Sequence, residues 1–376
     1  MCDPYRIAIV GAGVAGMALA ILASRQGYKV SLYERGTEVS SIGAGVTLWP
    51  NAMWVMRQMG LEQAVRQEGG APRFMRQFDS QGRQQGEFDI KAVNALSGFP
   101  SITILRRDLM RLLAGRLSKL GVEIRFGQNV SLECIDRLKQ THDLVVGADG
   151  RMNSVVRQAL YGDRVHPVYQ GFINIIGISR REESGIEPAI HEYRGAGERF
   201  GIVPVHAGLC YWAGAWAAPV DRERPLADWY RELRQRFMHW PDPVRQVLAS
   251  HESASLNRIF VHDLDPLPYW HRDNVLILGD AAHAPLPTSG QGACQALEDA
   301  WHLVRLLAEQ QETARVLQMF YQQRISKTTM AQAIGRRIAE SLFSQPGEVR
   351  AVMPSPSAEQ LNELWMQGLG GGSATD

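Results

Sequence analysis

The chain has 376 residues, which is too long for one compact core and suits two domains or one domain with a large insertion. Its formal net charge is +1, so the total charge gives no indication of nucleic-acid or anionic-membrane binding. It shows no signal peptide and no run of about 18 apolar residues, which predicts a cytoplasmic protein without membrane segments.

The first predicted elements form a strand, a glycine turn, a helix and a second strand. Arg6–Val10 is a short apolar, β-branched run that ends directly at the glycine-rich Gly11–Gly16. A helical segment then continues to Gln26, and Tyr28–Tyr33 alternates as a second strand that ends at Glu34. A G-x-G-x-x-G turn between a strand and a helix, followed by an acid, is typical of dinucleotide binding.

Each residue type in this turn has a physical role. Gly11 permits the tight turn, Gly13 lets the backbone approach a pyrophosphate, and Gly16 lets the helix pack close to the strand. Glu34 is predicted to accept hydrogen bonds from ribose hydroxyls, while Arg35 either stacks on an adenine or is solvated. FAD and NAD share this fingerprint, so the turn alone does not distinguish them.

The segment that follows favours a larger cofactor. Ser41–Asn51 is predicted to be a glycine loop that covers the ligand, although an ordinary surface loop has the same composition. A helix is expected over Ala52–Met59, and turn signals within residues 72–90 indicate a hairpin. An NAD-only domain would continue directly through alternating strands and helices.

Further strands and a second acidic turn are predicted in the next segment. Arg106 stands between a strand at Ile102–Leu105 and a helix, where a guanidinium reaches a cofactor phosphate or ribityl hydroxyl, or makes a surface salt bridge. Gly121–Phe126 and then Val130 are also predicted as strands. Asp143–Gly150 is an apolar strand that ends in an Asp-Gly turn, and ligands of α/β sheets lie outside such strand ends.

From about residue 169 to residue 261 the pattern changes to a mostly antiparallel sheet with two helices. Four strands are expected at Phe172–Ser179, Ala189–Tyr193, Phe200–Val205 and Cys210–Ala217. Such a sheet between two halves of a nucleotide-binding fold is a natural substrate-domain insertion. Its aromatic residues either sandwich a flat ring or pack in the core: Phe200, Tyr211, Trp212 and Trp216.

The stretch Asn274–Trp301 carries a third motif. An apolar strand is followed by Asp280, a loop rich in proline and glycine, and a helix that resumes at about Ala293. We expect Asp280 and the loop at residues 290–292 to hold the ribityl-phosphate half of a flavin, against the alternative of an ordinary strand–turn–helix. The chain is then predicted to be helical to about Phe343 and to end in a tail that carries two short apolar patches, at residues 349–353 and 361–365.

The four cysteines of the chain are predicted to be reduced thiols. Cys2, Cys134, Cys210 and Cys294 show no spacing typical of zinc ligands, and no signal peptide points to an oxidising compartment. No metal site is predicted.

Taken together, GAGVAG with Glu34, VVGADG at Val145–Gly150 and LGDAAHAPLPTSGQGACQALEDA at Leu278–Ala300 resemble the single-component FAD-dependent aromatic hydroxylases, the family of p-hydroxybenzoate and salicylate hydroxylases. The resemblance covers about residues 5–340. Within the family the chain is most similar to FAD-dependent urate hydroxylases, through TLWPN, GERFGIVPV, CYW and NRIFVHDLDPL, with salicylate and 6-hydroxynicotinate hydroxylases close competitors.

The resemblance implies a Rossmann-like α/β FAD-binding domain with an inserted, mostly antiparallel substrate domain and C-terminal helices. The FAD domain would comprise residues 1–71, 100–168 and 262–344, the substrate domain 72–99 and 169–261, and the tail 345–376. The implied cofactor residues are Gly11, Gly13, Gly16, Glu34, Arg35, Thr47, Arg106, Val130, Asp149, Asp280, Gly290, Gln291, Gly292, Ala293 and Cys294.

Among these cofactor residues, Val130 would contact adenine through its backbone and Asp149 belongs to a motif linked to FAD and nicotinamide nucleotides. Asp280 would bind the ribityl chain, and Gly290–Cys294 would lie along the isoalloxazine ring.

On the substrate side the resemblance implies that Arg199 clamps an anionic ring oxygen or carboxylate and that Tyr211 orients the ring. Thr288 stands where the urate enzymes carry an acid, which argues against urate itself and leaves phenols and N-heterocycles open. His206 and Tyr211 are candidates for proton transfer, although His206 is expected in a turn away from the pocket.

The implied activity is an NAD(P)H-dependent and O2-dependent monooxygenase that hydroxylates a small aromatic or N-heteroaromatic substrate through a flavin C4a-hydroperoxide. NADH or NADPH would be a transient co-substrate. A monomer or homodimer is expected, with neither nucleic acid nor membrane as a partner. The alternatives are a non-catalytic flavin- or nucleotide-binding protein that acts through a partner, and another flavoenzyme such as an oxidase.

Overall fold

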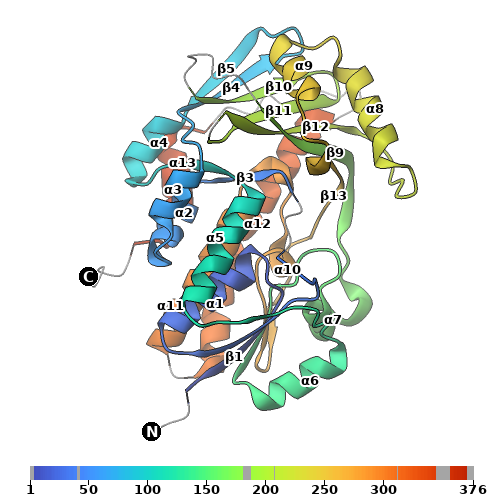
Figure 1. Cartoon of the computed structure of the whole chain (residues 1–376). Coiled ribbons are helices and arrows are strands. Elements are labelled where there is room, and N and C mark those ends of the chain that lie inside the picture. The colour runs from blue at the N-terminus through green and yellow to red at the C-terminus, as the bar shows by residue number, and fades with distance from the viewer. Residues whose placement is uncertain are drawn as a thin grey trace.

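A computed structural model describes residues 4–39, 43–180, 188–206, 208–310, 312–343 and 356–370. Two large sheets lie at opposite ends of the molecule, and helices cross the space between them (Figure 1). The six-stranded sheet contains the N-terminal strand, whereas the seven-stranded sheet is built mainly from the middle of the chain. This arrangement agrees with the predicted α/β fold with an inserted sheet.

The six-stranded sheet is parallel except for one edge strand. Its order is β14 (His271–Arg272), β15 (Val275–Ile277), β8 (Leu144–Gly147), β1 (Arg6–Val10), β2 (Lys29–Tyr33) and β7 (Ile124–Arg125). Only the β14–β15 pair is antiparallel. All four residues of β8 and the last four of β1 are buried, as in parallel strands that are covered on both faces.

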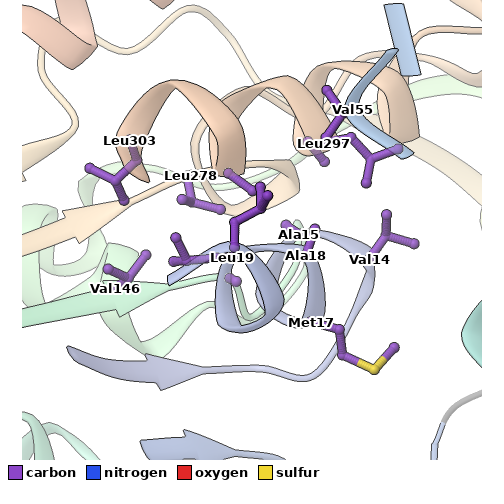
Figure 2. Close-up of a cluster of buried hydrophobic side chains, with 14 of the residues drawn as sticks. Val14, Ala15, Met17, Ala18, Leu19, Val55, Val146, Leu278, Leu297 and Leu303 are labelled. Carbon is purple, nitrogen blue, oxygen red and sulfur yellow. The ribbon is translucent and has the colours of Figure 1, made fainter. Parts of the chain in front are cut away.

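Helix α1 (Val14–Arg25) is the centre of the core beside this sheet. It packs against α11 (Gly292–Glu309) and α5 (Arg106–Lys119). Figure 2 shows Leu19 of α1 next to Leu278 and below the α11 side chains Leu297 and Leu303, all of which have no exposed surface. A helix that is apolar on all sides is stable only when it is enclosed in this way.

The seven-stranded sheet is mostly antiparallel, as predicted. Its order is β13 (Asn257–Asp263), β9 (Val168–Arg180), β12 (Leu209–Ala217), β11 (Glu198–Pro204), β10 (Ala189–Arg194), β4 (Phe74–Asp79) and β5 (Gln84–Asp89). Only β10 and β4 pair in parallel, and β4 and β5 form the predicted hairpin. Helices α8 (Leu226–Phe237) and α9 (Asp242–Ala249) cover one face, and we call the opposite face the inner face.

The inner face lies toward a small two-stranded sheet of β3 (Gly45–Leu48) and β6 (Ile102–Leu105). The prediction of a plain glycine loop over Ser41–Asn51 was therefore wrong in part, because residues 45–48 pair with β6. The remaining helices are α2 (Pro50–Gln58), α3 (Glu62–Glu68), α4 (Ile90–Ser97), α6 (Leu132–Thr141), α7 (Val155–Tyr161), α10 (Asp280–His283), α12 (Thr313–Phe343) and α13 (Ala358–Met366).

Two other predictions about elements need correction. Val130 lies in a loop rather than in a strand, because β7 is only two residues long and Ser131 caps α6 by accepting from the Cys134 backbone N–H. The C-terminal helical region is two helices, since α11 ends at Glu309 and α12 begins at Thr313. The apolar patch at residues 361–365 is part of α13, whereas residues 349–353 and the last six residues lie outside the described part.

None of the helices in the described ranges is long and apolar enough to cross a membrane.

Candidate active site

The three sequence motifs meet where four parallel strands end. Gly11 N donates to Tyr33 O at 2.8 Å, Ala148 N donates to Val10 O at 2.8 Å, and Leu278 N donates to Gly147 O at 3.0 Å. These bonds join the ends of β1, β2, β8 and β15, which we call the cofactor edge. The edge of a parallel sheet at which strands end is where α/β folds bind ligands.

The glycines of the first turn have different surroundings. Gly11 has φ of +102°, and a Cβ there would lie 2.4 Å from Ala148 O. A Cβ on Gly16 would lie 1.9 Å from Gly11 O, so both positions require glycine. A Cβ on Gly13 would meet nothing within 4 Å, which means that the space in front of this helix N-terminus is open to a phosphate group.

Glu34 holds the first turn against the second strand. Its carboxylate accepts from Ala12 N at 2.9 Å and from Gly36 N at 2.8 Å, while Gln128 N donates to its backbone O at 2.9 Å. Each carboxylate oxygen has a second lone pair, so Glu34 can also accept from ribose hydroxyls. The backbone bond from Gln128 brings the loop that contains Val130 to the same end of the edge, and Arg35 next to Glu34 is exposed.

Arg106 extends from the end of β6 into a half-buried position beside Gly43, where a Cβ would lie 2.7 Å from Arg106 Cδ. Its Nε is buried and has no hydrogen-bond partner within the described ranges. Burial lowers the pKa of Arg106, and the charge of Asp280 opposes that effect. The surface-salt-bridge alternative is therefore wrong, and the orphaned donor fits an anionic or hydroxylated cofactor group.

Asp149 is used inside its own turn. Its carboxylate accepts from Ser154 Oγ at 2.6 Å and from Val156 N at 3.2 Å, and burial raises its pKa. Arg157, which is 3% exposed, ties this turn to the third motif by donating to Ala281 O at 3.0 Å. A contact between Asp149 and a nucleotide remains a prediction.

The loop that follows β15 is held by a buried carboxylate of α11. Asp299 accepts from Gly279 N at 2.8 Å and from His283 Nε2 at 2.5 Å, and its other oxygen accepts from Arg324 Nε at 2.7 Å. Burial alone would raise the pKa of Asp299, but His283 and Arg324 outweigh it and lower the pKa. This anchoring sets the position of Asp280 at the start of α10.

The Gly290–Cys294 segment is fixed from several sides. Trp49 Nε1 donates to Gly290 O at 3.1 Å, and Asn51 Nδ2 donates to Gln291 Oε1 at 3.0 Å. The buried Nε2 of Gln291 has no partner in the described part of the chain, so it is a second orphaned donor beside the proposed flavin position. Cys294 begins the buried side of α11, and burial raises the pKa of its thiol to about 12.

Tyr211 connects the inner face to the two-stranded sheet. Its hydroxyl lies 3.1 Å from Thr47 Oγ1, and its ring covers Gly45 so closely that a Cβ there would lie 2.2 Å from the ring. Desolvation raises the pKa of the half-buried Tyr211 hydroxyl, so it stays protonated and can donate or accept a hydrogen bond at neutral pH.

Arg199 lies on the same inner face. β11 residues 199, 201 and 203 oppose β12 residues 215, 213 and 211, so the side chains of Arg199 and Tyr211 point to the same side of the sheet. Arg199 Nη2 donates to Glu192 Oε2 at 3.0 Å, and Arg194 Nη2 lies 2.5 Å from Glu192 Oε1.

Glu192 is buried between these two arginines. Burial alone would raise its pKa, but Arg199 and Arg194 outweigh burial and lower the pKa of Glu192 to about 2. The buried Nε of Arg199 has no hydrogen-bond partner in the described part of the chain.

The other aromatic candidates face away from this site. Phe200, Trp212 and Trp216 are at most 1% exposed and pack with α8 and α9 on the opposite face of the sheet. The core-packing alternative is therefore right for these three. Alternate residues along a strand point to opposite faces of the sheet, and these three alternate with the residues that face the site. His206 is exposed in a bend, and Thr288 Oγ1 donates to Gly335 O at 2.6 Å.

Comparison with known proteins agrees with this geometry. Residues 5–331 match the family described as FAD binding domain. The chain belongs to this FAD-binding family. It is 30% identical over 345 residues to an aurachin C monooxygenase/isomerase from Stigmatella aurantiaca, covering 89% of this chain and 88% of that protein.

A FAD-dependent urate hydroxylase from Klebsiella pneumoniae is 28% identical, with 85% of each chain covered. The crystal structure of Klebsiella pneumoniae HpxO complexed with FAD and uric acid superimposes with a TM-score of 0.81 at 24% identity, covering 96% of this chain and 92% of that chain. The predicted fold, the FAD cofactor and the assignment to the FAD-dependent monooxygenases are confirmed.

Several residues that organise the site were not found by the sequence analysis. The partners of Arg157 and Asp299 are 124 and 20 residues away, and Glu192 pairs with Arg199 on the neighbouring strand, so no local spacing motif indicates any of the three. A buried acid or arginine inside an apolar element was the one available sign, since such groups are rarely buried without a partner.

Proposed function

We propose that this protein uses FAD, NADH or NADPH, and O2 to hydroxylate a small aromatic or N-heteroaromatic ring that binds between the cofactor edge and the inner face. The observation that carries the proposal is the placement of Arg199 and Tyr211 on one face, with Tyr211 bonded to Thr47 at the cofactor side. Bound FAD would supply the electrons that activate O2, a chemistry that side chains cannot provide.

The residues of the chain would bind, orient and enclose the ring. Arg199 would hold an anionic ring oxygen or carboxylate through its unpaired Nε, and the Tyr211 hydroxyl would orient the ring. Ile176 and Ile178, at 8% and 4% exposure, make the neighbouring part of the inner face apolar, which would keep water from the reacting centre.

The presence of a threonine at position 288 favours a substrate that carries an acidic hydroxyl of its own. Its side chain donates to Gly335 O and offers no carboxylate to act as a base. A phenol or hydroxylated N-heterocycle loses its proton near neutral pH more readily when Arg199 stabilises the anion. We therefore propose such rings, rather than urate, as the substrate class.

We also propose that the division into domains follows the two large sheets. The strands of the six-stranded sheet fall within residues 1–71, 100–168 and 262–344, and those of the seven-stranded sheet fall within 72–99 and 169–261 apart from one or two end residues. A cytoplasmic location is part of the same proposal.

The test is a screen for substrate-stimulated NADH and NADPH oxidation with aromatic acids, purines and hydroxypyridines, using the yellow purified protein. We expect Arg199→Ala to raise KM for a stimulating ring at least tenfold while FAD content, measured by absorbance, stays unchanged. Arg194→Ala is the matched control, because Arg194 pairs with the same Glu192 carboxylate.

A tenfold KM change in both arginine variants would show that Arg199 acts only by neutralising Glu192. Failure of every ring to stimulate oxidation would contradict the proposed hydroxylase activity.

A further inference from the structure

The C-terminal helix α13 lies beyond residue 331, where the family match ends, yet it is built into the site. It packs against α2 and α4, beside which it lies in Figure 1. Its Trp365 is only 7% exposed and belongs to the main core cluster. Because α2 in turn packs against α11, which begins at the loop that contains Gly290, α13 is placed to influence that loop.

The first route from α13 to the flavin loop is aromatic. The rings of Trp365 and Trp49 have centroids 4.7 Å apart, and Trp49 Nε1 donates to Gly290 O at 3.1 Å. Gly290 has φ of +63°, and a Cβ there would lie 3.2 Å from Trp49 Nε1. The position of the Trp49 indole, and with it the Gly290 carbonyl, thus depends on Trp365.

The second route runs through a buried ammonium group. Lys327 Nζ, on α12, donates to Trp365 O at 2.6 Å, to Gln367 O at 3.1 Å and to Glu298 Oε2 at 2.8 Å. These three bonds use all three of its protons, so loss of the C-terminal carbonyls would leave a 5% exposed ammonium with a single acceptor. Burial lowers the pKa of Lys327, and Glu298 opposes that effect.

Glu298 carries this second route onward to the loop. Its Oε1 accepts from Asn51 Nδ2 at 2.7 Å, and the same amide group donates to Gln291 Oε1 at 3.0 Å. Arg324 Nη1 also donates to Glu298, at 2.7 Å. The aromatic route ends on Gly290 and the charged route on Gln291, so both converge on adjacent residues of one loop.

We propose that α13 is a positioning element that fixes the Gly290-Gln291 backbone and thereby sets the environment of the flavin. The inference rests on the proposed placement of the isoalloxazine ring along residues 290–294. Trp365, Trp49 and Lys327 are positioning residues in this scheme, because they act through the loop.

Trp365→Ala in the full-length, FAD-loaded protein tests the proposal. We expect the variant to retain FAD, to change in flavin fluorescence and midpoint potential, and to release roughly fivefold more peroxide per NADH, the ratio expected when loss of the ring contact weakens the hydrogen bond from Trp49 Nε1 to Gly290 O by about 1 kcal/mol. Trp365→Phe, which keeps an aromatic ring against Trp49, should restore wild-type behaviour. Glu363→Ala, on the exposed side of α13, is the matched control and should not change the flavin signals.

Trp49→Phe separates the hydrogen bond from the packing and decides the matter if Trp365→Ala does not fold. It keeps a ring against Trp365 but removes the Nε1 donor to Gly290 O, so its fluorescence and potential should also change. Wild-type flavin signals in Trp49→Phe, or equal changes in Glu363→Ala and Trp365→Ala, would overturn the role of α13.

Gln291→Ala distinguishes failure of this inference from failure of the flavin placement. A changed flavin signal in Gln291→Ala together with unchanged signals in the two tryptophan variants would overturn the role of α13 alone. An unchanged signal in Gln291→Ala as well would show that the flavin does not lie along this loop.

Discussion

At the cofactor edge the contacts are made largely by backbone atoms, whereas on the inner face they are made by side chains. Gly11 N, Ala148 N and Leu278 N join the ends of neighbouring strands, and glycines leave room in front of them. On the inner face, Arg199 and Tyr211 depend on Glu192 and Thr47. A site built from backbone atoms tolerates side-chain substitutions unless the new side chain fills the space that the site needs. A site built from side chains is disrupted when one of two paired side chains is removed.

The largest effect is expected at the tightest part of the cofactor edge. Gly11→Ala would place a Cβ 2.4 Å from Ala148 O at φ of +102°. We expect it to lower the free energy of unfolding by about 2 to 4 kcal/mol and to abolish FAD retention. Thermal unfolding and flavin absorbance measure the two effects.

Gly13→Ala is the matched control for this change. A Cβ at Gly13 meets nothing within 4 Å, so the FAD-free protein should unfold within about 0.5 kcal/mol of wild type while binding FAD more weakly. Equal losses of stability in both variants would contradict the distinction between close packing at Gly11 and ligand access at Gly13.

The second effect concerns the buried acid on the inner face. Glu192→Gln would leave Arg199, with a 20% exposed side chain, beside a neutral amide. We expect a loss of about 3 kcal/mol in the free energy of unfolding at pH 7, because removing one partner leaves a buried charge uncompensated. FAD content should be retained if the protein is assayed below its unfolding temperature.

This loss should depend on pH in a defined direction. The pKa of Glu192 is lowered to about 2, so its stabilisation is present above the unfolded value of about 4.5 and is lost as pH falls toward 2. Denaturant unfolding of the wild type and of Glu192→Gln should therefore converge as pH is lowered from about 5. A difference that stays constant over this interval would argue that Glu192 acts through packing alone.

A smaller effect is expected where the two regions meet. Tyr211→Phe removes the hydroxyl that lies 3.1 Å from Thr47 Oγ1 and should cost about 1 kcal/mol of stability. Thr47→Val should cost a similar amount, and the double variant should cost less than the sum if the two hydroxyls interact. Additive losses in this cycle would show that the hydroxyls do not stabilise each other.

The smallest structural effect is expected from thiol modification. Hydrogen bonds from Ser131 and Arg137 lower the pKa of the half-buried Cys134 thiol to about 7, whereas burial raises that of Cys294 to about 12. Iodoacetamide should therefore label Cys134 with a midpoint near pH 7 and leave Cys294 unlabelled in the folded protein, as followed by mass spectrometry. Labelling of Cys294 at neutral pH would show that the base of the flavin loop opens.

The sequence by itself determined the cofactor edge. The order of strand, G-x-G-x-x-G, helix, strand and Glu34 specifies a parallel βαβ unit, since glycine spacing and strand ends are local features. Local sequence features likewise predicted Asp280 at the end of β15 and the alternating strands of the inserted sheet.

Tertiary structure decided which side chains serve the substrate side and what supports the loop. Parity along β11 and β12 separates Arg199 and Tyr211 from Phe200, Trp212 and Trp216, and that parity depends on which sheet face the helices cover. The pairing of Glu192 with Arg199, of Lys327 with the α13 carbonyls, and of Trp49 with Gly290 joins residues that are far apart in sequence or on different elements. Such contacts follow from packing between elements, and this packing is not encoded by local sequence patterns.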